Sequence, residues 1–296
     1  MTPYPTKRVK TLAEHTGAVH YVTYNKTGQY CLSGSRDRSI MLWNASTGAR
    51  IQTYSAHGRD VLGISVTADN SRFASCGNDR TVFCWDVSTG SVIRRYAGHY
   101  ESVNCVGFND DGTVLASGSF DTTVRLWDCR SQNTSPIQIL EDCKDSVMSL
   151  LIRGAELIVG SADGRLRNYD IRMGQLQEDY IGAAITSVRM SKDRNCILVS
   201  TTDDTIRLMD KANGTLLNEF KGHQQTEYKL QSAFSNDDAY VLSGSEDNKL
   251  YIWDLLEGNQ VEALEGHKGI VTSIDYHPTE TAMISGSVDG SIMIWE

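Results

Sequence analysis

The chain has 296 residues, of which 40% are hydrophobic and 22% are charged. Its apolar runs reach about five or six residues, short of the roughly 20 that span a bilayer, and no secretory signal follows Met1. The net charge of −9 opposes binding driven by phosphate neutralisation. We therefore expect no membrane association and no direct nucleic-acid binding.

The first predicted element is the strand RVKTL at residues 8–12, preceded by a tail at residues 1–6. It alternates apolar and polar residues and leads into His15, as the end of a repeat would. The stretch SVIRRYAGH, which ends at His99, has the same pattern in mid-chain. The chain thus begins with the last piece of its own repeat.

Seven similar segments follow, of which SGSFDTTVRLW (residues 117–127) is one. In each segment an aspartate lies six positions before a large closing residue, and successive closing residues are 40 to 44 positions apart. The pairs are Asp37 and Trp43, Asp79 and Trp85, Asp121 and Trp127, Asp163 and Tyr169, Asp203 and Met209, Asp247 and Trp253, and Asp289 and Trp295. A regular repeat of this length predicts a solenoid or a propeller.

The third repeat illustrates the predicted local structure, with strands at 103–108, 113–119, 123–127 and 136–140. Four short strands per repeat predict one blade of a β-propeller. We therefore expect an all-β fold, a single seven-bladed propeller of four-stranded antiparallel blades. The blades are expected at about 15–54, 57–97, 99–140, 143–181, 182–221, 223–264, and 267–296 plus 7–12.

Closure of the ring follows from the two ends of the sequence. The seventh repeat stops one residue after its third strand, at Glu296, so its outer strand is missing. Residues 7–12 form a fourth strand with no blade before them. Their pairing with the last blade would remove both unpaired sheet edges.

Five of the seven histidines occupy one position in the repeat: His15, His57, His99, His223 and His267. A catalytic triad of histidine, aspartate and serine is the alternative, but an enzyme does not usually carry five copies of its general base. The sequence contains no nucleophile elbow, phosphate-binding loop or dinucleotide fingerprint, and no histidine has a metal-ligand neighbour at suitable spacing. We predict no enzyme activity, no cofactor and no metal site.

The repeats resemble the WD-repeat family, with histidine before the first strand and a Trp-Asp pair after the third. That resemblance implies a hydrogen-bonded series through His99, Ser117, Asp121 and Trp127. Repeat four has Cys143 in place of histidine, and repeat five has neither the histidine nor the tryptophan. We expect weaker internal networks there, and easier opening of residues 143–221.

Three stretches resemble the mitogen-activated protein kinase organiser branch of WD-repeat proteins: YDIRMGQLQEDYIGAAIT, LLNEFKGHQQTEYKL and SIDYHPTE. The resemblance implies a scaffold for kinase cascades that is also found with the splicing machinery, in cytoplasm and nucleus. Seven cysteines without a C-x-x-C pair fit such reducing compartments. We expect partner proteins from one of these complexes, and a chain that is itself monomeric.

Partner binding is expected on one face, which we call the top face. It carries the loops that enter each first strand and the loops between second and third strands. Tyr100 and Phe120 are exposed aromatics of the kind that anchor interfaces. The predicted contact residues are Arg36, Arg59, Asp60, Tyr100, Glu101, Phe120, Lys144, Tyr228, Glu246 and Lys268.

The stretches WDCR and YDIR support an alternative function. In WD-repeat substrate receptors of cullin-RING ubiquitin ligases, paired arginines at this position contact the ligase adaptor. The matching residues are Arg130 and Arg172. The simpler interpretation is that each arginine pairs with its neighbouring aspartate, Asp128 or Asp170.

Overall fold

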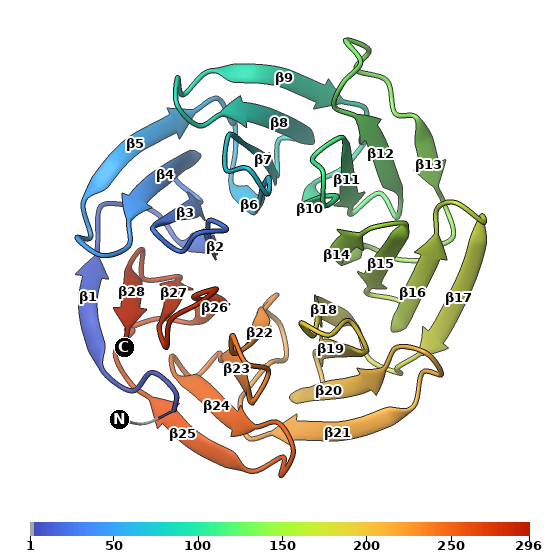
Figure 1. Cartoon of the computed structure of the whole chain (residues 1–296). Helices are drawn as coiled ribbons and strands as arrows, with labels where there is room; N and C mark the ends of the chain where they lie inside the picture. The colour runs from blue at the N-terminus through green and yellow to red at the C-terminus, as the bar shows by residue number, and fades with distance from the viewer. Residues whose placement is uncertain (1–2) are drawn as a thin grey trace.

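Seven four-stranded antiparallel sheets form a ring around a central axis, which confirms the predicted all-β, seven-bladed propeller (Figure 1). The computed structural model describes residues 3–296, and every regular element in that range is a strand. In each blade the first strand of the repeat lies nearest the axis and the fourth lies at the rim (Figure 1). Short turns join successive strands, which makes the pairing antiparallel.

The first four blades each take their strands from consecutive sequence. Blade one contains β2 (Val19–Tyr24), β3 (Tyr30–Ser35), β4 (Ser39–Asn44) and β5 (Arg50–Ser55). Blade two contains β6 (Val61–Val66), β7 (Arg72–Gly77), β8 (Thr81–Asp86) and β9 (Val92–Ala97). Blade three contains β10 (Val103–Phe108), β11 (Val114–Ser119), β12 (Val124–Asp128) and β13 (Gln138–Leu140). Blade four contains β14 (Val147–Arg153), β15 (Glu156–Ser161), β16 (Arg165–Asp170) and β17 (Gln175–Tyr180).

The remaining three blades include the only one built from both ends of the described chain. Blade five contains β18 (Ile185–Met190), β19 (Cys196–Thr201), β20 (Thr205–Asp210) and β21 (Leu216–Lys221). Blade six contains β22 (Ser232–Phe234), β23 (Tyr240–Gly244), β24 (Leu250–Asp254) and β25 (Gln260–Leu264). Blade seven contains β26 (Val271–Tyr276), β27 (Met283–Ser287), β28 (Ile292–Trp295) and β1 (Arg8–Leu12).

The hydrophobic core lies between neighbouring blades. Each of seven buried clusters combines residues of two adjacent blades, as Leu126 and Leu150 do between blades three and four. The middle strands are therefore buried on both faces, whereas the rim strands are mostly exposed. All five tryptophans are at most 2% exposed, because they end third strands inside these layers.

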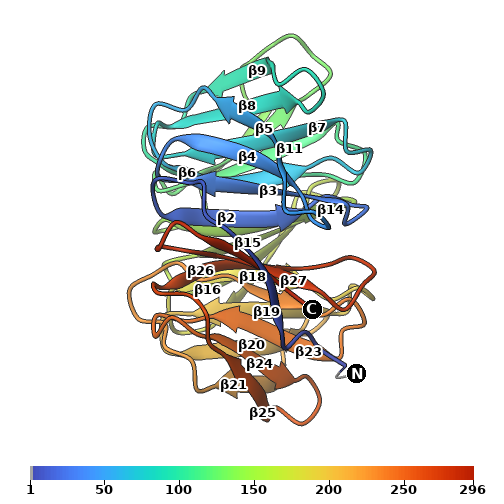
Figure 2. The ribbon, with the colours of Figure 1, turned by 90° about the vertical axis from the view of Figure 1, so that its left-hand side faces the viewer.

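The amino-terminal strand closes the ring as the sequence predicts. Strand β1 pairs antiparallel with β28, with Thr11 opposite Met293 and Leu12 opposite Ile292. The backbone of Lys7 exchanges hydrogen bonds of 2.8 and 2.9 Å with that of Glu296. Both views place β1 beside the last blade, near the carboxyl terminus (Figures 1 and 2).

Hydrogen bonds between blades also join the inner strands around the axis. In four places a serine hydroxyl of one blade accepts a backbone N–H from the inner strand of the next. The pairs are Ser65 with Phe108 (3.1 Å), Ser149 with Val188 (3.0 Å), Ser187 with Ser232 (3.4 Å) and Ser273 with Val22 (2.9 Å). Each bond occupies one backbone donor of an inner strand.

Candidate functional site

A hydrogen-bonded series runs through blade three and supports its top face. The His99 Nδ1 atom lies 2.9 Å from Asp121 Oδ2, and its Nε2 atom lies 2.8 Å from Ser117 Oγ. The Trp127 indole N–H donates to the same Ser117 oxygen over 2.9 Å. Because Ser117 accepts from the indole, its own hydroxyl donates to Nε2, and Nδ1–H donates to the carboxylate. The same series is present in blades one and two, centred on His15 and His57.

The series stabilises the fold and is not arranged as a nucleophilic centre. Ser117 is fully buried and His99 is only 6% exposed, so no substrate can reach the hydroxyl. Burial opposes ionisation of Asp121, but hydrogen bonds from His99 and Thr123 still hold the pKa of Asp121 well below its usual range. The Asp121 carboxylate also accepts the backbone N–H of Tyr100 over 2.9 Å. The aspartate thereby ties the buried series to the loop above it.

The histidine position differs in the last two blades. In blade seven, His267 keeps Ser285 at 2.7 Å, but its Nδ1 atom lies nearer to Ser291 (3.1 Å) than to Asp289 (3.4 Å). In blade six the expected series is absent. Neither ring nitrogen of His223 has a hydrogen-bond partner of good geometry, and Trp253 instead donates to the backbone carbonyl of Lys221 over 3.0 Å.

The physical reason lies in the third strand of blade six. The Tyr251 hydroxyl donates to Asp247 over 2.7 Å and so takes the carboxylate that His223 would have used. The longer loop of this repeat, which places histidine 24 rather than 22 residues before its aspartate, moves the ring as well. Our assignment of His223 to the structural network was therefore wrong.

We expect His99→Ala to lower the free energy of unfolding by roughly 2–4 kcal/mol, because it leaves Asp121 and Ser117 buried without their partner. His223→Ala is the matched control, since it removes the same ring from the same position without breaking such a series. The free energy of unfolding lost by His223→Ala should be smaller than that lost by His99→Ala by about 1–3 kcal/mol. Urea denaturation of both variants measures the difference. Equal losses would show that the hydrogen bonds of His99 add nothing to packing.

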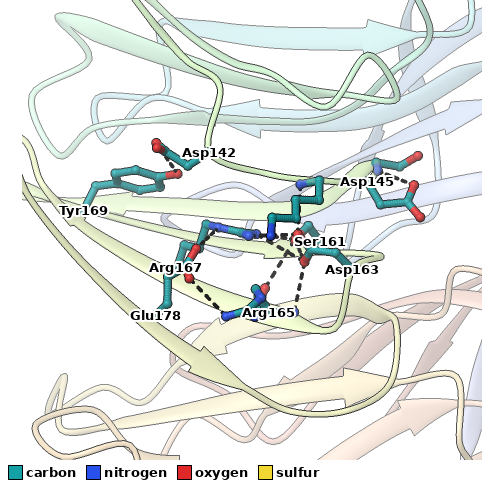
Figure 3. A network of polar contacts seen from close by, with 10 residues as sticks. Asp142, Asp145, Ser161, Asp163, Arg165, Arg167, Tyr169 and Glu178 are labelled. Atoms are coloured by element: carbon teal, nitrogen blue, oxygen red, sulfur yellow. Dashed lines mark hydrogen bonds and ion pairs between the residues drawn. The ribbon is translucent and has the colours of Figure 1, made fainter.

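Blade four replaces the histidine series with a buried arginine (Figure 3). The fully buried Arg167 guanidinium donates to Ser161 Oγ (2.7 Å), to Asp163 Oδ2 (2.8 Å) and to Glu178 Oε1 (2.6 Å). Burial opposes the charge on Arg167, but Asp163 and Glu178 raise its pKa nonetheless. Burial likewise opposes ionisation of Asp163, yet hydrogen bonds from Arg167 and Ser161 lower its pKa to about 2.

Blade five repeats the same arrangement with different residues. Arg207 donates to Thr201 Oγ1 and to Asp203 Oδ2, both over 2.6 Å, and its Nε atom lies 3.7 Å from Glu219 Oε1. Arg167 and Arg207 occupy corresponding positions, each four residues after its turn aspartate. Blades four and five therefore have networks of their own, in which arginine fills the space that histidine leaves, and easier opening of residues 143–221 stays a prediction.

The top face brings most of the predicted contact residues to the surface. Tyr100 and Phe120 are 74% and 59% exposed and come from the two top-face loops of blade three. The Arg125 guanidinium lies 5.5 Å from the centre of the Tyr100 ring, a cation–π distance. The other exposed members of the predicted set are Arg36, Arg59, Glu101, Lys144, Tyr228 and Lys268.

Two predicted contact residues instead hold the top face together. The Glu246 carboxylate accepts the backbone N–H groups of Thr226, Glu227 and Tyr228 over 2.8 to 2.9 Å. It thereby fixes the longer loop of blade six. Asp60 is half-buried, and its carboxylate lies 3.6 Å from His20 Nε2. The Glu246 carboxylate is therefore not free for a partner.

Arg130 and Arg172 lie in the loops after the third strands of blades three and four, on the face opposite Tyr100 and Phe120. The Arg130 Nε–H donates to the Asp128 carboxylate over 3.2 Å, as the simpler interpretation expects. The backbone N–H of Arg172 donates to Asp170 over 2.9 Å, and its side chain is exposed. A ligase adaptor and a partner on the top face would therefore use opposite sides of the ring.

A cavity along the axis was missed by sequence reasoning. Its volume is 560 Å³, and it lies among the ends of the inner strands, on the face opposite Tyr100 and Phe120. Arginine and lysine residues line it, from positions that are far apart in the sequence. No local sequence motif identifies these residues, because each belongs to an ordinary strand or turn of its own repeat. Within residues 3–296 no group of acidic, histidine or cysteine side chains could hold a metal ion.

Comparison with known proteins defines the class. The family model described as Nucleolar protein 10-like, N-terminal domain, a β-propeller, matches residues 35–232. The model described as WD domain, G-beta repeat matches residues 6–44, 214–254 and 258–296. The chain belongs to the WD-repeat family of β-propellers, whose members are typically non-catalytic scaffolds. No helix in residues 3–296 is long and apolar enough to cross a membrane.

The similarity extends to one group of relatives within that family. The chain is 52% identical over 291 residues to WD repeat domain-containing protein 83 of Rattus norvegicus, covering 98% of this chain and 92% of the relative. The protein of the same name in Homo sapiens has the same identity and coverage. That in Danio rerio is 48% identical over 301 residues, covering 99% and 95%. These matches confirm the resemblance to the mitogen-activated protein kinase organiser branch.

Proposed function

We propose that the chain is a non-catalytic scaffold that binds partner proteins through the top face of blade three. The observation that carries the proposal is that two aromatic residues in neighbouring loops are exposed. Tyr100 is 74% exposed and Phe120 is 59% exposed. Aromatic side chains bury a large area at little entropic cost, and they dominate the energetics of protein interfaces. An exposed pair of this kind, beside charged residues, fits the centre and rim of a binding site.

Hydrogen bonds and a cation–π contact hold the loops that carry these aromatics. The Tyr100 backbone is held by Asp121, and the Phe120 N–H donates to the carbonyl of Ser102 over 2.8 Å. Arg125 lies against the Tyr100 ring and limits its rotation. Binding to such a surface loses little conformational entropy, which favours a specific scaffold.

The proposed partners are components of a mitogen-activated protein kinase cascade or of a pre-mRNA splicing complex. The resemblance of repeats four to seven to the kinase organiser branch supports both assignments. All seven cysteines are free thiols, which suits the proposed locations in cytoplasm and nucleus. Pairing of β1 with β28 leaves no incomplete blade, which supports a scaffold that is itself monomeric.

We expect the double variant Tyr100→Ser and Phe120→Ser to lose partner capture by about tenfold or more, because two interface anchors are removed. Folding should be unchanged, since both side chains are exposed. Affinity purification with quantitative mass spectrometry of kinase and spliceosomal proteins measures the loss. The control is Arg130→Glu with Arg172→Glu on the opposite face, which should keep capture intact. Full capture by the aromatic variant would place the binding site elsewhere.

The same experiment separates the ligase alternative. A substrate receptor would co-purify with a cullin adaptor, and the arginine double variant would lose it. The pairing of Arg130 with Asp128 over 3.2 Å weakens this alternative, because the arginine already has an ionic partner. The arginine of blade three is nonetheless 73% exposed, so charge reversal there leaves the core undisturbed.

A further inference from the structure

The cavity along the axis, which we call the lower cavity, has the size of a ligand site. Its 560 Å³ falls within the range of small-molecule pockets. Inner strands and turns of six blades line it, including Tyr21, Ile64, Val106, Leu150 and Asp275. Its walls are partly apolar, so charges inside it are screened less than charges on the outer surface.

Positive charge gathers in the lower cavity although the whole chain carries −9. Its lining includes five cations, Lys26, Arg153, Arg189, Lys192 and Arg194, against two carboxylates, Asp110 and Asp275. The cations converge from blade one on one side of the ring and from blades four and five on the other (Figure 1). The charge of the cavity lining is therefore positive, whereas the net charge of the whole chain is negative.

The two carboxylates offset only part of this positive charge, Asp275 through its attraction to Arg189. Asp110 lies 3.6 Å from Arg153 and 3.5 Å from Arg194, so one acid serves two arginines. Asp275 accepts the Tyr24 N–H over 2.8 Å and the Thr23 hydroxyl over 2.9 Å. Burial raises the pKa of Asp275, and attraction from Arg189 opposes this rise.

Several of these cations also repel one another. Burial is the largest influence that lowers the pKa of Lys26, and repulsion from Arg153 adds to it. Burial lowers the pKa of Arg153 as well, with repulsion from Arg194 and Arg189 opposing the attraction of Asp110. A bound anion would relieve this repulsion, and arginine forks match the oxygens of phosphate groups.

The shape of the channel favours a compact anion over an extended peptide. Backbone donors of Val22, Phe108 and Val188 on the inner strands are already taken by serines of the neighbouring blades. An inserted strand would find these donors occupied. Further along the axis, the half-buried Lys229 of blade six donates to the carbonyl of Asn104 in blade three over 2.7 Å. That contact narrows the channel beyond the cavity.

We propose that the lower cavity binds a compact polyphosphate anion, held by Lys26, Arg153, Arg189 and Arg194. The site is independent of the partner surface, because it lies on the face opposite Tyr100 and Phe120. A scaffold with such a site would couple its stability to the supply of this anion, because any ligand of the native state stabilises it.

Calorimetric titration of the full chain tests the proposal with inositol hexakisphosphate, inorganic tripolyphosphate and a hexaglutamate peptide. We expect at least one phosphate compound to bind, more weakly as salt is raised. Tighter binding of inositol hexakisphosphate would indicate that the natural ligand is a phosphorylated ring compound. Tighter binding of tripolyphosphate would indicate a linear polyphosphate. Equal affinity for hexaglutamate would overturn the assignment to phosphate, and no binding of either phosphate at millimolar concentration would overturn the site.

The double variant Lys26→Ala with Arg194→Ala removes two cations of the lower cavity, and should weaken phosphate binding about tenfold or more. The control variant, Arg36→Ala with Arg59→Ala, removes the same amount of charge from the top face. It should leave phosphate binding unchanged. If both variants lost the same phosphate affinity, the effect would come from the net charge of the chain, and the proposed site would be overturned. Hydrogen exchange of the unmodified chain gives a second test, because bound phosphate should slow exchange at residues 24–26 and 189–194. Slowing only elsewhere would contradict the proposal.

Discussion

Replacement of Arg167 by methionine is expected to lower the free energy of unfolding by about 3–5 kcal/mol. The variant leaves Asp163 and Ser161 in the interior without the guanidinium that they share, at 2.8 and 2.7 Å. Removing one member of a buried ion pair costs more than the pair contributes, because the remaining charge keeps its desolvation penalty. Arg167 is fully buried, so water cannot take the place of the lost donors.

Arg165→Met provides the matched control in the same strand. Arg165 is 35% exposed and meets Glu178 over 3.1 Å at the surface, so its loss should stay within about 1 kcal/mol. Urea denaturation at neutral pH compares the two variants. If both lose the same small amount, the buried network of blade four does not stabilise the fold.

The effect of Arg167→Met should depend on pH in a defined direction. The pKa of Asp163 is lowered to about 2 in the folded chain, mainly by Arg167 and Ser161 against the opposing effect of burial. A folded pKa below the unfolded value of about 3.9 means that the stabilisation is present above pH 4 and is lost as pH falls toward 2. The difference between variant and parent should therefore shrink on acidification. A difference that grew would contradict this assignment.

Deletion of residues 1–12 is expected to cost more than about 4 kcal/mol, because it removes a whole strand rather than one side chain. The deletion takes β1 from β28 and uncovers Ile292 and Ile294, which now pack with Leu12 in one buried cluster. An open edge on β28 would also pair with other copies. Thermal unfolding and size-exclusion chromatography measure the two effects.

The control for this truncation lacks only residues 2–3 and should behave as the parent chain. A synthetic peptide of residues 1–14, added to the truncated chain, should raise its melting temperature with concentration, as any ligand of the native state does. A truncated chain that stays monomeric with the parent's melting temperature would mean that β1 is not needed for closure.

Much of the architecture could be predicted because repetition makes local signals redundant. The aspartate six residues before each large closing residue, and the alternation between them, recur often enough to define seven blades. The missing fourth strand of the last repeat and the surplus strand at residues 8–12 then indicated the closure, which the pairing of β1 with β28 confirms. Exposure of Tyr100 and Phe120 could also be expected, from their positions in loops.

The arginines of blades three to five show where sequence reasoning stopped. Arg125, Arg167 and Arg207 stand at the same position of their repeats, but only the last two bond to the turn aspartates of their blades. In blade three His99 already occupies Asp121, so Arg125 is left beside Tyr100. The role of each arginine depends on whether histidine has left the aspartate free, and that is settled by packing among strands.

The sequence by itself determined the number of blades, the order of strands and the strand that closes the ring, because these follow from periodic patterns along the chain. Only the tertiary structure decided that His223 stands outside its network, that Arg167 and Arg207 replace histidine, and that Lys26, Arg153 and Arg189 share one cavity. Hydrogen bonds and electrostatic repulsion depend on distances of a few ångströms between side chains from different strands. Residues more than a hundred positions apart reach such distances only when the ring has closed.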